Sequence, residues 1–278
     1  MNTVEVEKVD KIALLAYWIK ERELIRLKKE AGLPRPWTED QILDNYRFTN
    51  VHREDDAVTK WIAAHWRNPF VHHSNLMAAM VLARMINLPE TLEHVGFPEV
   101  WETNTIRHRI KERRDKGFKW LNSAYLITTC GVKMDKIDYI VDVADTVHHH
   151  QQKWEPGEHS LKNYHTYLTQ FKGLGSFLSA QVVADLKNTP GHPLKNAPDW
   201  WSWAAVGPGS LRGLQAVLGR PDVPQRQFLA LAKQAYKDVS THFGGYLGIC
   251  MQDFQNCLCE FSKYWRAYDG TGSPKQRY

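Results

Sequence analysis

The sequence is poor in residues that would cross-link the chain or anchor it in a membrane. Its 278 residues include four cysteines, and no apolar run approaches the ~20 residues that cross a bilayer. The first residues lack a signal-peptide pattern. The one close cysteine pair, Cys257 and Cys259, has no second matching pair, so the spacing does not indicate a metal centre. We therefore expect a protein of a reducing cytoplasm, with buried thiols, no metal site and no membrane partner.

Signals for strands and for P-loop kinases are missing too. Alternating strand patterns bounded by hairpin turns do not occur, and no stretch fits G-x-x-x-x-G-K-[ST], so the chain itself is not expected to be such a kinase. Apolar residues instead recur at helical spacing, which predicts an all-α fold. The expected helices cover 12–27, 42–43, 53–66, 74–87, 99–115, 120–130, 135–149, 158–170, 175–187, 210–218, 225–243 and 250–266.

The same pattern predicts one unit over 1–278, built as two helical lobes with a cleft between them. One lobe is expected to cover 121–219 and the other 1–120 with 220–266. Residues 267–278 are expected to form a flexible tail, because glycine and polar residues dominate there.

Charge and tryptophan content allow a nucleic-acid partner without requiring one. The net charge is +5, which suits a local basic patch but is also common in enzymes of neutral substrates. Several of the eleven tryptophans stand beside a basic residue: Trp66–Arg67, Lys119–Trp120 and Lys153–Trp154. Rings next to cations suit base stacking beside phosphates, whereas core packing explains most of them equally well.

The segment Phe171-Lys-Gly-Leu-Gly-Ser176 ends one predicted helix and opens the next. Glycine permits the tight turn, and the amides of a helix N-terminus bind anions readily. The segment resembles the hairpin that grips a phosphate in helix-hairpin-helix DNA glycosylases, which makes Lys172, Gly173, Gly175 and Ser176 the predicted DNA contacts. An ordinary corner between two helices is the alternative.

Asp199 follows Gly175 by 24 residues (199 − 175), a distance similar to that of the glycosylases' catalytic aspartate. The preceding loop, 188–198, contains three prolines, which hold the residue rigidly. We predict that Asp199 acts as a general base or stabilises charge. The alternative is a helix N-cap.

Two polar blocks in the first half of the chain are candidates for ligand binding. The first places Asn50, Arg53 and Asp56 at a helix entry, where an arginine can bind phosphate or carboxylate with two hydrogen bonds. A surface ion-pair network is the alternative reading. The second runs from Lys119 to Asn122-Ser-Ala-Tyr125, whose amide and phenol would share one helix face. The start of an amphipathic helix explains it equally well.

Two further blocks lie in the second half. Gly207-Pro-Gly209-Ser210 opens a helix, so that free amides, a hydroxyl and Arg212 could meet a pyrophosphate. Near the end, one helix face is expected to carry a polar stripe: Asp253, Asn256, Glu260 and Lys263. Such a stripe is commonly a solvated face with an ion pair, and acids that contact a substrate would look the same.

Taken in order, the four blocks resemble the α-glutamyl/putrescinyl thymine pyrophosphorylases, phage transferases of thymine hypermodification. The matching residues are Tyr46, Phe48, Asn50, Arg53 and Asp56; Asn122, Ala124 and Tyr125; Gly207 to Ser210, Gly213 and Leu214; and Gln252, Asp253, Asn256, Leu258, Cys259, Glu260, Phe261 and Lys263. The resemblance covers about residues 17–266 and implies a fold related to the helix-hairpin-helix glycosylases. Phe177 stands where lyase-type members of that superfamily carry a catalytic lysine, which argues against lyase chemistry.

The resemblance also implies a reaction. A separate kinase would pyrophosphorylate 5-hydroxymethyluracil in double-stranded DNA, and glycine, glutamate or putrescine would then displace pyrophosphate from the flipped base. Arg53, Lys119, Arg212 and the amides of 207–210 would stabilise the leaving group, with Asp199 or Asp253 as the base and Glu260 in reserve. No cofactor is implied, although a divalent cation could accompany the pyrophosphate, and the setting would be the cytoplasm of an infected bacterium. A glycosylase for a modified base and a non-catalytic DNA-binding partner of the kinase are the alternatives.

Overall fold

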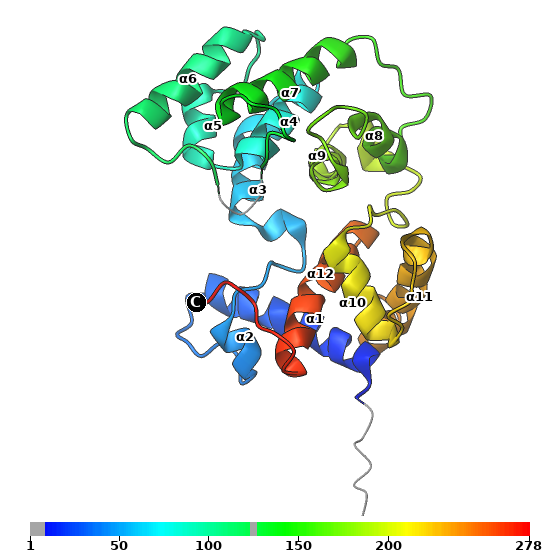
Figure 1. The fold of residues 1–278 in the computed structure, drawn as a ribbon. Coiled ribbons are helices and arrows are strands. Elements are labelled where there is room, and N and C mark those ends of the chain that lie inside the picture. The colour runs from blue at the N-terminus through cyan, green and yellow to red at the C-terminus, as the bar shows by residue number, and fades with distance from the viewer. Residues whose placement is uncertain (1–8, 123–126) are drawn as a thin grey trace, which may run out of the picture. The chain divides into compact units, whose positions relative to one another are not determined.

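The computed structural model describes residues 9–122 and 127–278, and its regular elements within these ranges are helices (Figure 1). The prediction of an all-α fold is confirmed. Within the same ranges, no helix combines the length and hydropathy needed to cross a bilayer. Tyr125 of the second polar block lies outside the described residues.

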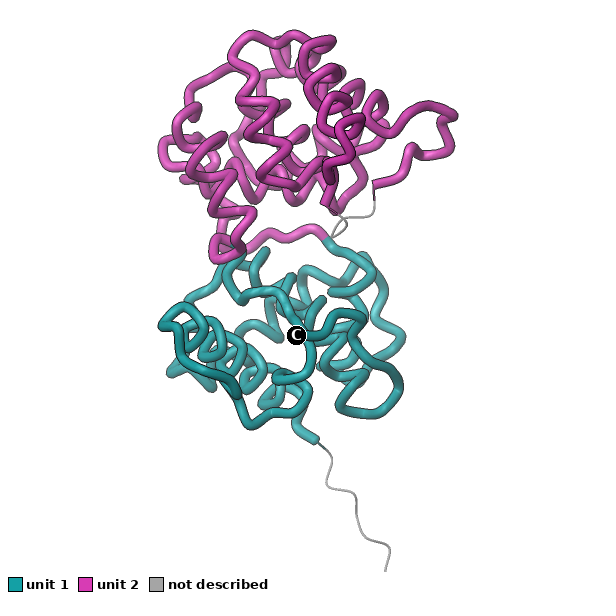
Figure 2. Tube along the Cα trace, turned by 90° about the vertical axis from the view of Figure 1, so that its left-hand side faces the viewer, with its two compact units in different colours: residues 1–53, 206–278 teal, residues 54–205 magenta. Residues whose placement is uncertain are grey.

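The chain forms two compact units, which Figure 2 distinguishes by colour. Unit 1 comprises residues 1–53 and 206–278, and unit 2 comprises residues 54–205. The boundaries differ from the expected ones at 120 and 219. They differ because the helices on either side of position 120, α6 (Thr103–Asp115) and α7 (Lys136–Gln151), pack against each other inside unit 2.

Unit 2 is built around α4 (Leu76–Ile86), in which every residue is buried. Helices α7 and α9 (Ser176–Asn188) pack against α4, and α8 (Leu161–Leu168) packs against α9. A buried ion pair ties α4 to α9, because Arg84 donates from Nε and Nη2 to the two carboxylate oxygens of Asp185 at 2.6 and 2.5 Å. The remaining elements are the 3-10 turn η1 (Arg53–Asp55), α3 (Ala57–Ile62), the π-helical turn η2 (Ala63–Arg67), α5 (Pro89–Val95) and the 3-10 turn η3 (Pro193–Asn196).

Unit 1 joins the two ends of the chain. Its elements are α1 (Lys11–Glu30), α2 (Gln41–Asn45), α10 (Pro208–Leu218), η4 (Gln225–Gln227), α11 (Phe228–Ser240), η5 (Thr241–Phe243) and α12 (Met251–Tyr268). Helices α10 and α12 cross so closely that a Cβ added to Gly213 would lie 1.9 Å from the carbonyl oxygen of Leu258. A Cβ on Gly209 would lie 2.3 Å from the Sγ of Cys259. Glycine at both positions therefore permits this crossing.

Two expectations about local structure differ from what is observed. The helix predicted over 120–130 is wrong in its described residues, 120–122 and 127–130, which have no helical structure. Glycines with positive φ at 117 and 131 bracket this stretch. The tail is also not loose at its end: Arg277 bridges Tyr46 in antiparallel fashion, and Tyr278 donates its N–H to the carbonyl of Asn45.

Candidate nucleic-acid interface

A turn joins two helices at the predicted position. Helix α8 ends at Leu168 and α9 begins at Ser176, with Gly173, Leu174 and Gly175 in the turn between them. Gly173 has a φ of +99°, and a Cβ there would lie 2.8 Å from both the Tyr139 hydroxyl and a Val143 methyl group. The first glycine of the turn is therefore needed for its backbone conformation and for packing against α7.

Gly175 occupies a different environment from Gly173. It is the N-cap of α9 with an ordinary φ of −71°, and a Cβ added there would meet nothing within 4 Å. Gly175, Ser176 and Lys172 are all exposed. Because the N-terminus of a helix is the positive end of its dipole, this exposed corner favours an anion.

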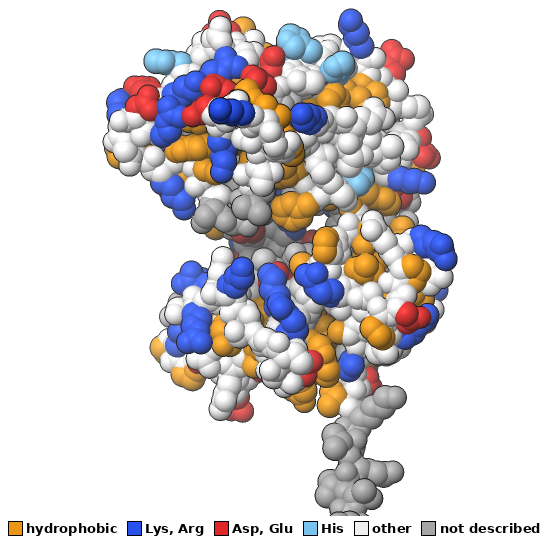
Figure 3. Space-filling view, viewed as in Figure 1, with side chains coloured by type: hydrophobic (Ala, Val, Ile, Leu, Met, Phe, Trp, Pro, Cys, Tyr) orange, Lys and Arg blue, Asp and Glu red, His pale blue; other side chains and the backbone are white. Residues whose placement is uncertain are grey.

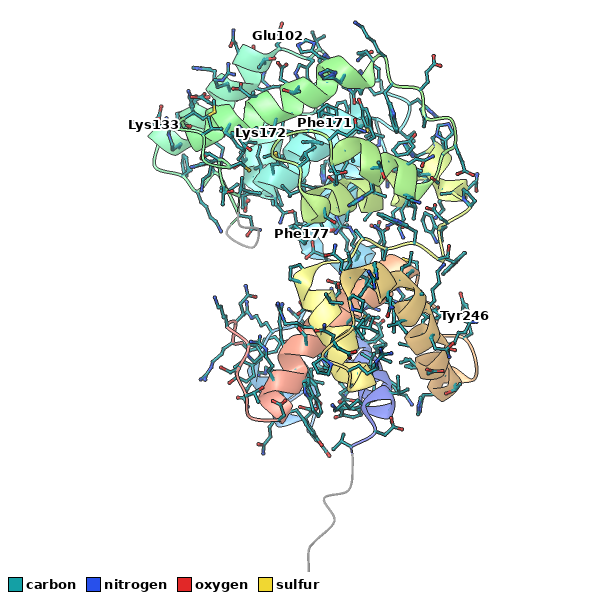
Figure 4. The ribbon with its side chains drawn as sticks, turned by 45° about the vertical axis from the view of Figure 1, so that its right-hand side comes forward. Glu102, Lys133, Phe171, Lys172, Phe177 and Tyr246 are labelled. Atoms are coloured by element: carbon teal, nitrogen blue, oxygen red, sulfur yellow. The ribbon has the colours of Figure 1, made fainter. Side chains whose placement is uncertain are left out.

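A groove of about 560 Å³ lies beside the turn. It is lined by residues from the end of α7, the loop that follows it, and the region from the end of α8 into the turn: Thr146, His150, Lys153, Trp154, Tyr167, Gln170, Phe171 and Lys172. In Figure 4, Phe171 and Lys172 lie near α7, whereas Phe177, at the start of α9, lies at another edge of unit 2. The groove thus combines aromatic rings and cations with the residues that lead into the α8–α9 turn.

The rings of the groove contact one another. Trp154 stacks on Tyr167 with centroids 3.9 Å apart and an interplanar angle of 12°, and Phe171 meets Tyr167 edge-on at 5.1 Å. Lys153 and Lys172 are exposed, and no carboxylate among the described residues lies within 4.0 Å of either ammonium group. Stacked rings flanked by unpaired cations are the usual features of a surface that binds nucleic acid.

Sequence reasoning identified Lys153–Trp154 as a cation beside an aromatic ring, but it missed His150, Tyr167 and Phe171. A signal was present, since Tyr167 and Phe171 are four residues apart near the end of a predicted helix, where side chains at this spacing face the same way. The local sequence does not predict which element these two rings contact, because that depends on how α7 and α8 are placed in the folded unit.

Asp199 binds the N-terminus of α8. Its two carboxylate oxygens accept the N–H groups of Leu161 at 2.8 Å and of Lys162 at 3.0 Å, while Ser160 Oγ accepts that of Asn163 at 3.2 Å. The first three amides of α8 are therefore all satisfied, and the negative charge lies at the positive end of the helix dipole. This geometry favours the capping interpretation of Asp199, although the capped helix is not the one that follows it in sequence.

The structure brings residues 49–53, around the first polar block, against the fourth block in unit 1, although 200 or more positions separate the bonded residues. Glu260 accepts the N–H of Thr49 at 3.2 Å, Asp253 accepts that of Arg53 at 3.2 Å, and Asn256 donates to Thr49 Oγ1 at 3.0 Å. The polar stripe of α12 thus holds the segment 48–53 against the helix.

Each acid of the stripe also has a second partner, either in α12 or at its N-cap. Glu260 is buried and accepts from Lys263 at 2.5 Å, and Asp253 accepts from Cys250 Sγ at 3.2 Å. From α1, the buried Arg22 donates to the amide oxygen of Asn50 at 2.6 Å. Asn50, Arg53, Asp253, Asn256, Glu260 and Lys263 therefore lie along the contact between the segment 48–53 and α12, and we call them the α12 cluster.

The start of α10 is used differently from the expectation. Ser210 is fully buried, and its hydroxyl accepts from the N–H of Gly207 at 3.1 Å and donates to the carbonyl of the same residue at 3.0 Å. The missing side chain of Gly209 faces α12. The hydroxyl that the sequence assigned to a pyrophosphate is thus engaged in a cap, while Arg212 stays exposed.

The remaining predicted ligands lie in unit 2. Asp56 caps α3 by accepting the Thr59 N–H at 2.9 Å, and its backbone precedes the helix. Lys119 is exposed in the segment after α6, and Asn122 donates its backbone N–H to the carbonyl of Ile86 at 3.0 Å. In the part of the chain that the structure describes, no three His, Cys, Asp or Glu side chains converge as metal ligands would.

Comparison with known proteins identifies the family. Residues 10–272 match the family described as 5-hmdU DNA kinase, helical domain. The chain belongs to this family. A 5-hmdU DNA kinase of Bacillus phage SP10 is 24% identical over 271 residues, which cover 85% of this chain and 42% of the phage protein. The chain thus spans less than half the length of that relative, and no solved structure matches it.

The helical-domain family and the resemblance based on the four blocks agree on the modified base but differ on the reaction. The name of the relative refers to phosphorylation of DNA that contains 5-hmdU, whereas the block resemblance implies a later amine transfer. The match to a helical domain is consistent with a chain in which no P-loop sequence occurs.

Proposed function

We propose that this chain binds DNA carrying a modified 5-hydroxymethyluracil and transfers an amine to that base, with release of pyrophosphate. The observation that carries the DNA-binding part is the aromatic and cationic groove beside the α8–α9 turn. Membership of the 5-hmdU kinase helical-domain family supports the choice of base. The four sequence blocks support the choice of reaction.

In this proposal the α8–α9 turn holds the DNA backbone. The positive end of the α9 helix dipole, at the exposed Gly175, attracts a phosphate, and Lys153 and Lys172 neutralise its neighbours. A base cannot react while stacked in a duplex, so the modified nucleotide must leave the helix. The half-buried ring of Trp154, which stacks on the buried Tyr167, offers a surface on which a neighbouring unpaired base can lie.

The chemical step joins an amine nitrogen to the exocyclic methylene carbon while the bond from that carbon to the pyrophosphate oxygen breaks. The attacking amine must be neutral, and a carboxylate takes up the proton released by the new C–N bond. We assign this role to the α12 cluster, with Asp253 or Glu260 as the acceptor, because both belong to the fourth sequence block, whereas both oxygens of Asp199 accept backbone N–H groups at the N-terminus of α8. Arg53, Arg212 and Lys263 are the cations proposed to stabilise the pyrophosphate.

A second candidate function is a DNA-binding domain that serves a kinase without catalysing a reaction itself. The specific observation in its favour is that Asp199, Asp253 and Glu260 each already accept hydrogen bonds from backbone amides. Carboxylates used in this way explain their presence without chemistry.

One experiment separates these functions. Duplex DNA with pyrophosphorylated 5-hydroxymethyluracil is incubated with the protein and a mixture of glycine, glutamate and putrescine, and the nucleosides are identified by mass spectrometry. An amine-substituted thymine supports the transferase. DNA binding without a product supports the kinase partner, and abasic sites indicate a glycosylase.

Matched variants assign the carboxylate. Glu260→Gln and Asp253→Asn each remove one candidate, and Asp222→Asn removes an exposed acid of unit 1 outside the α12 cluster. Loss of the proton acceptor is expected to lower the rate by roughly 10²–10⁴. Equal rates in all three variants would remove the α12 cluster from the chemistry.

A further inference from the structure

The C-terminal segment of unit 1 carries arginines that lie on aromatic rings. Arg277 lies 5.4 Å from the ring centroid of Tyr46, and Arg47 lies 5.4 Å from that of Tyr278. Arg35 approaches the same Tyr278 ring at 4.8 Å. Tyr278 is therefore contacted by guanidinium groups from two separate segments of the chain.

Backbone pairing fixes this arrangement. Arg47 donates its N–H to the carbonyl of Gln276 at 3.1 Å, and Tyr278 donates its N–H to the carbonyl of Asn45 at 3.3 Å. Pro274, just before this pairing, is buried. Two stretches of sequence more than 200 positions apart thus present their cations on one rigid surface.

Most of these cations have no acidic partner. Arg35 pairs with Asp44 at 2.9 Å. Arg47, Lys275 and Arg277 are exposed, and no carboxylate among the described residues lies within ion-pair distance of any of them. Figure 3 shows Lys and Arg side chains gathered over the part of unit 1 where Figure 1 marks the C terminus.

We propose that this surface, which we call the C-terminal cationic surface, binds the phosphate backbone of nucleic acid. It comprises Arg35, Arg47, Lys275 and Arg277 with the rings of Trp37, Tyr46 and Tyr278. The inference rests on the proposed function in so far as DNA is the partner, but it concerns unit 1 rather than the groove of unit 2.

The chemistry favours a polyanion with regularly spaced phosphates. A guanidinium that lies against a ring is held in place through the ring while its N–H groups remain available, and their planar arrangement matches two phosphate oxygens. Several such groups on a fixed backbone lose little conformational entropy on binding. The aromatic rings beside them can also receive unstacked bases.

The test is DNA binding by fluorescence anisotropy at several salt concentrations, with the full chain and a labelled duplex. Arg47→Gln with Arg277→Gln is expected to weaken binding roughly 10-fold and to lower the salt dependence by about one counterion for each lost phosphate contact. The control, Lys233→Gln with Lys237→Gln, removes the same charge from exposed positions of α11 and is expected to bind like the wild-type protein. If both double variants weaken binding equally, the loss of affinity follows from the lower net charge and not from these arginines, and the proposal is overturned.

A ring variant tests preorganisation. Tyr278→Leu removes the ring between Arg35 and Arg47 without changing the charge, and it is expected to weaken binding several-fold while thermal unfolding, followed in parallel, still shows a folded protein. Unchanged affinity in both the arginine and the ring variants would leave the tail with a purely structural role and overturn the inference.

If the wild-type chain fails to bind any DNA, the proposed function itself fails. Binding that is lost in the groove variant Lys172→Gln but kept in the arginine variant contradicts only the C-terminal cationic surface.

Discussion

Two glycine-containing helix starts in this chain look alike in sequence and differ in structure. At the start of α9, Gly175 has open space where a side chain would be, and the residues that lead into its turn line a groove with aromatic rings and cations. In the first two turns of α10, Gly209 and Gly213 face α12, and the nearest atoms to an added Cβ lie at 2.3 and 1.9 Å. The first start presents its backbone to solvent, and the second uses missing side chains to bring two helices together.

The comparison teaches that a glycine near a helix N-terminus is not itself a sign of anion binding. Whether such a glycine leaves the helix N-terminus open to an anion depends on what surrounds the position of the missing side chain. The two sites also differ in what holds them. Steric fit holds the α10–α12 crossing, whereas α8 in the hairpin depends on the charged Asp199 and on contact with the titratable His192. Substitution and pH should therefore affect the two sites differently.

The largest expected effect is that of Gly213→Ala. The new methyl group would collide with the backbone of Leu258, which cannot move without separating α10 from α12. We expect a loss of about 4 kcal/mol or more in the free energy of unfolding, at the upper end of overpacking effects. Gly207→Ala on the same helix is the control, since its Cβ would meet only Ser210 Oγ at 3.8 Å. Similar denaturant midpoints for the two variants would contradict the steric account of the crossing.

Acid should destabilise the hairpin side of the molecule. Burial lowers the pKa of His192 to about 4, with a smaller contribution from His159. Its Nδ1 accepts the N–H of Leu194 at 3.2 Å, and its ring contacts Tyr164 of α8. Because the folded pKa lies below the unfolded value near 6.5, the contribution is complete above that pH and is lost as the pH falls toward 4.

A pKa shift of this size corresponds to about 3 kcal/mol in the free energy of unfolding. His192→Asn keeps an acceptor for the Leu194 N–H but cannot titrate, so its stability should fall less between pH 6.5 and pH 4 than that of the wild-type protein. Chemical denaturation across this range measures the difference. Parallel pH profiles for the two proteins would show that His192 does not carry the acid sensitivity.

A smaller loss is expected for Asp199→Asn. The amide can accept only one of the two N–H groups at the start of α8 and turns a donor toward the other, which should cost about 1–2 kcal/mol. Turnover per folded molecule should stay near that of the wild type if the carboxylate is a cap. A rate loss of roughly 10²–10⁴ with unchanged thermal unfolding would instead restore the catalytic interpretation.

The sequence predicted those parts of the fold that depend on local pattern. Helical spacing located α1, α4, α7 and α12, and the glycines located the turn between α8 and α9. Helix α5 was missed because it begins at Pro89, a residue that interrupts a helix elsewhere but is favourable at its first position.

The features that depend on distant partners were not predictable in this way. The ordered end of the tail depends on pairing with 45–47, and the use of Gly209 depends on Cys259. The sequence pattern found the polar stripe on α12, but it gave no sign that these side chains hold the segment 48–53. The α7 side of the groove could not be predicted from the sequence either, because the α7 residues that complete it become neighbours of Phe171 only in the folded unit.

The central claim is that the exposed corner at Gly175 contacts a nucleic-acid phosphate, and one matched pair of variants tests it most directly. Asn and Asp cap helices about equally well, so Gly175→Asn and Gly175→Asp should unfold at similar temperatures, while the aspartate alone adds a negative charge at the proposed phosphate site. With DNA binding measured by fluorescence anisotropy, we predict that Gly175→Asn stays within about 2-fold of wild type and that Gly175→Asp weakens binding roughly 10-fold, equivalent to 1.4 kcal/mol. Equal affinity of the two variants would contradict the claim.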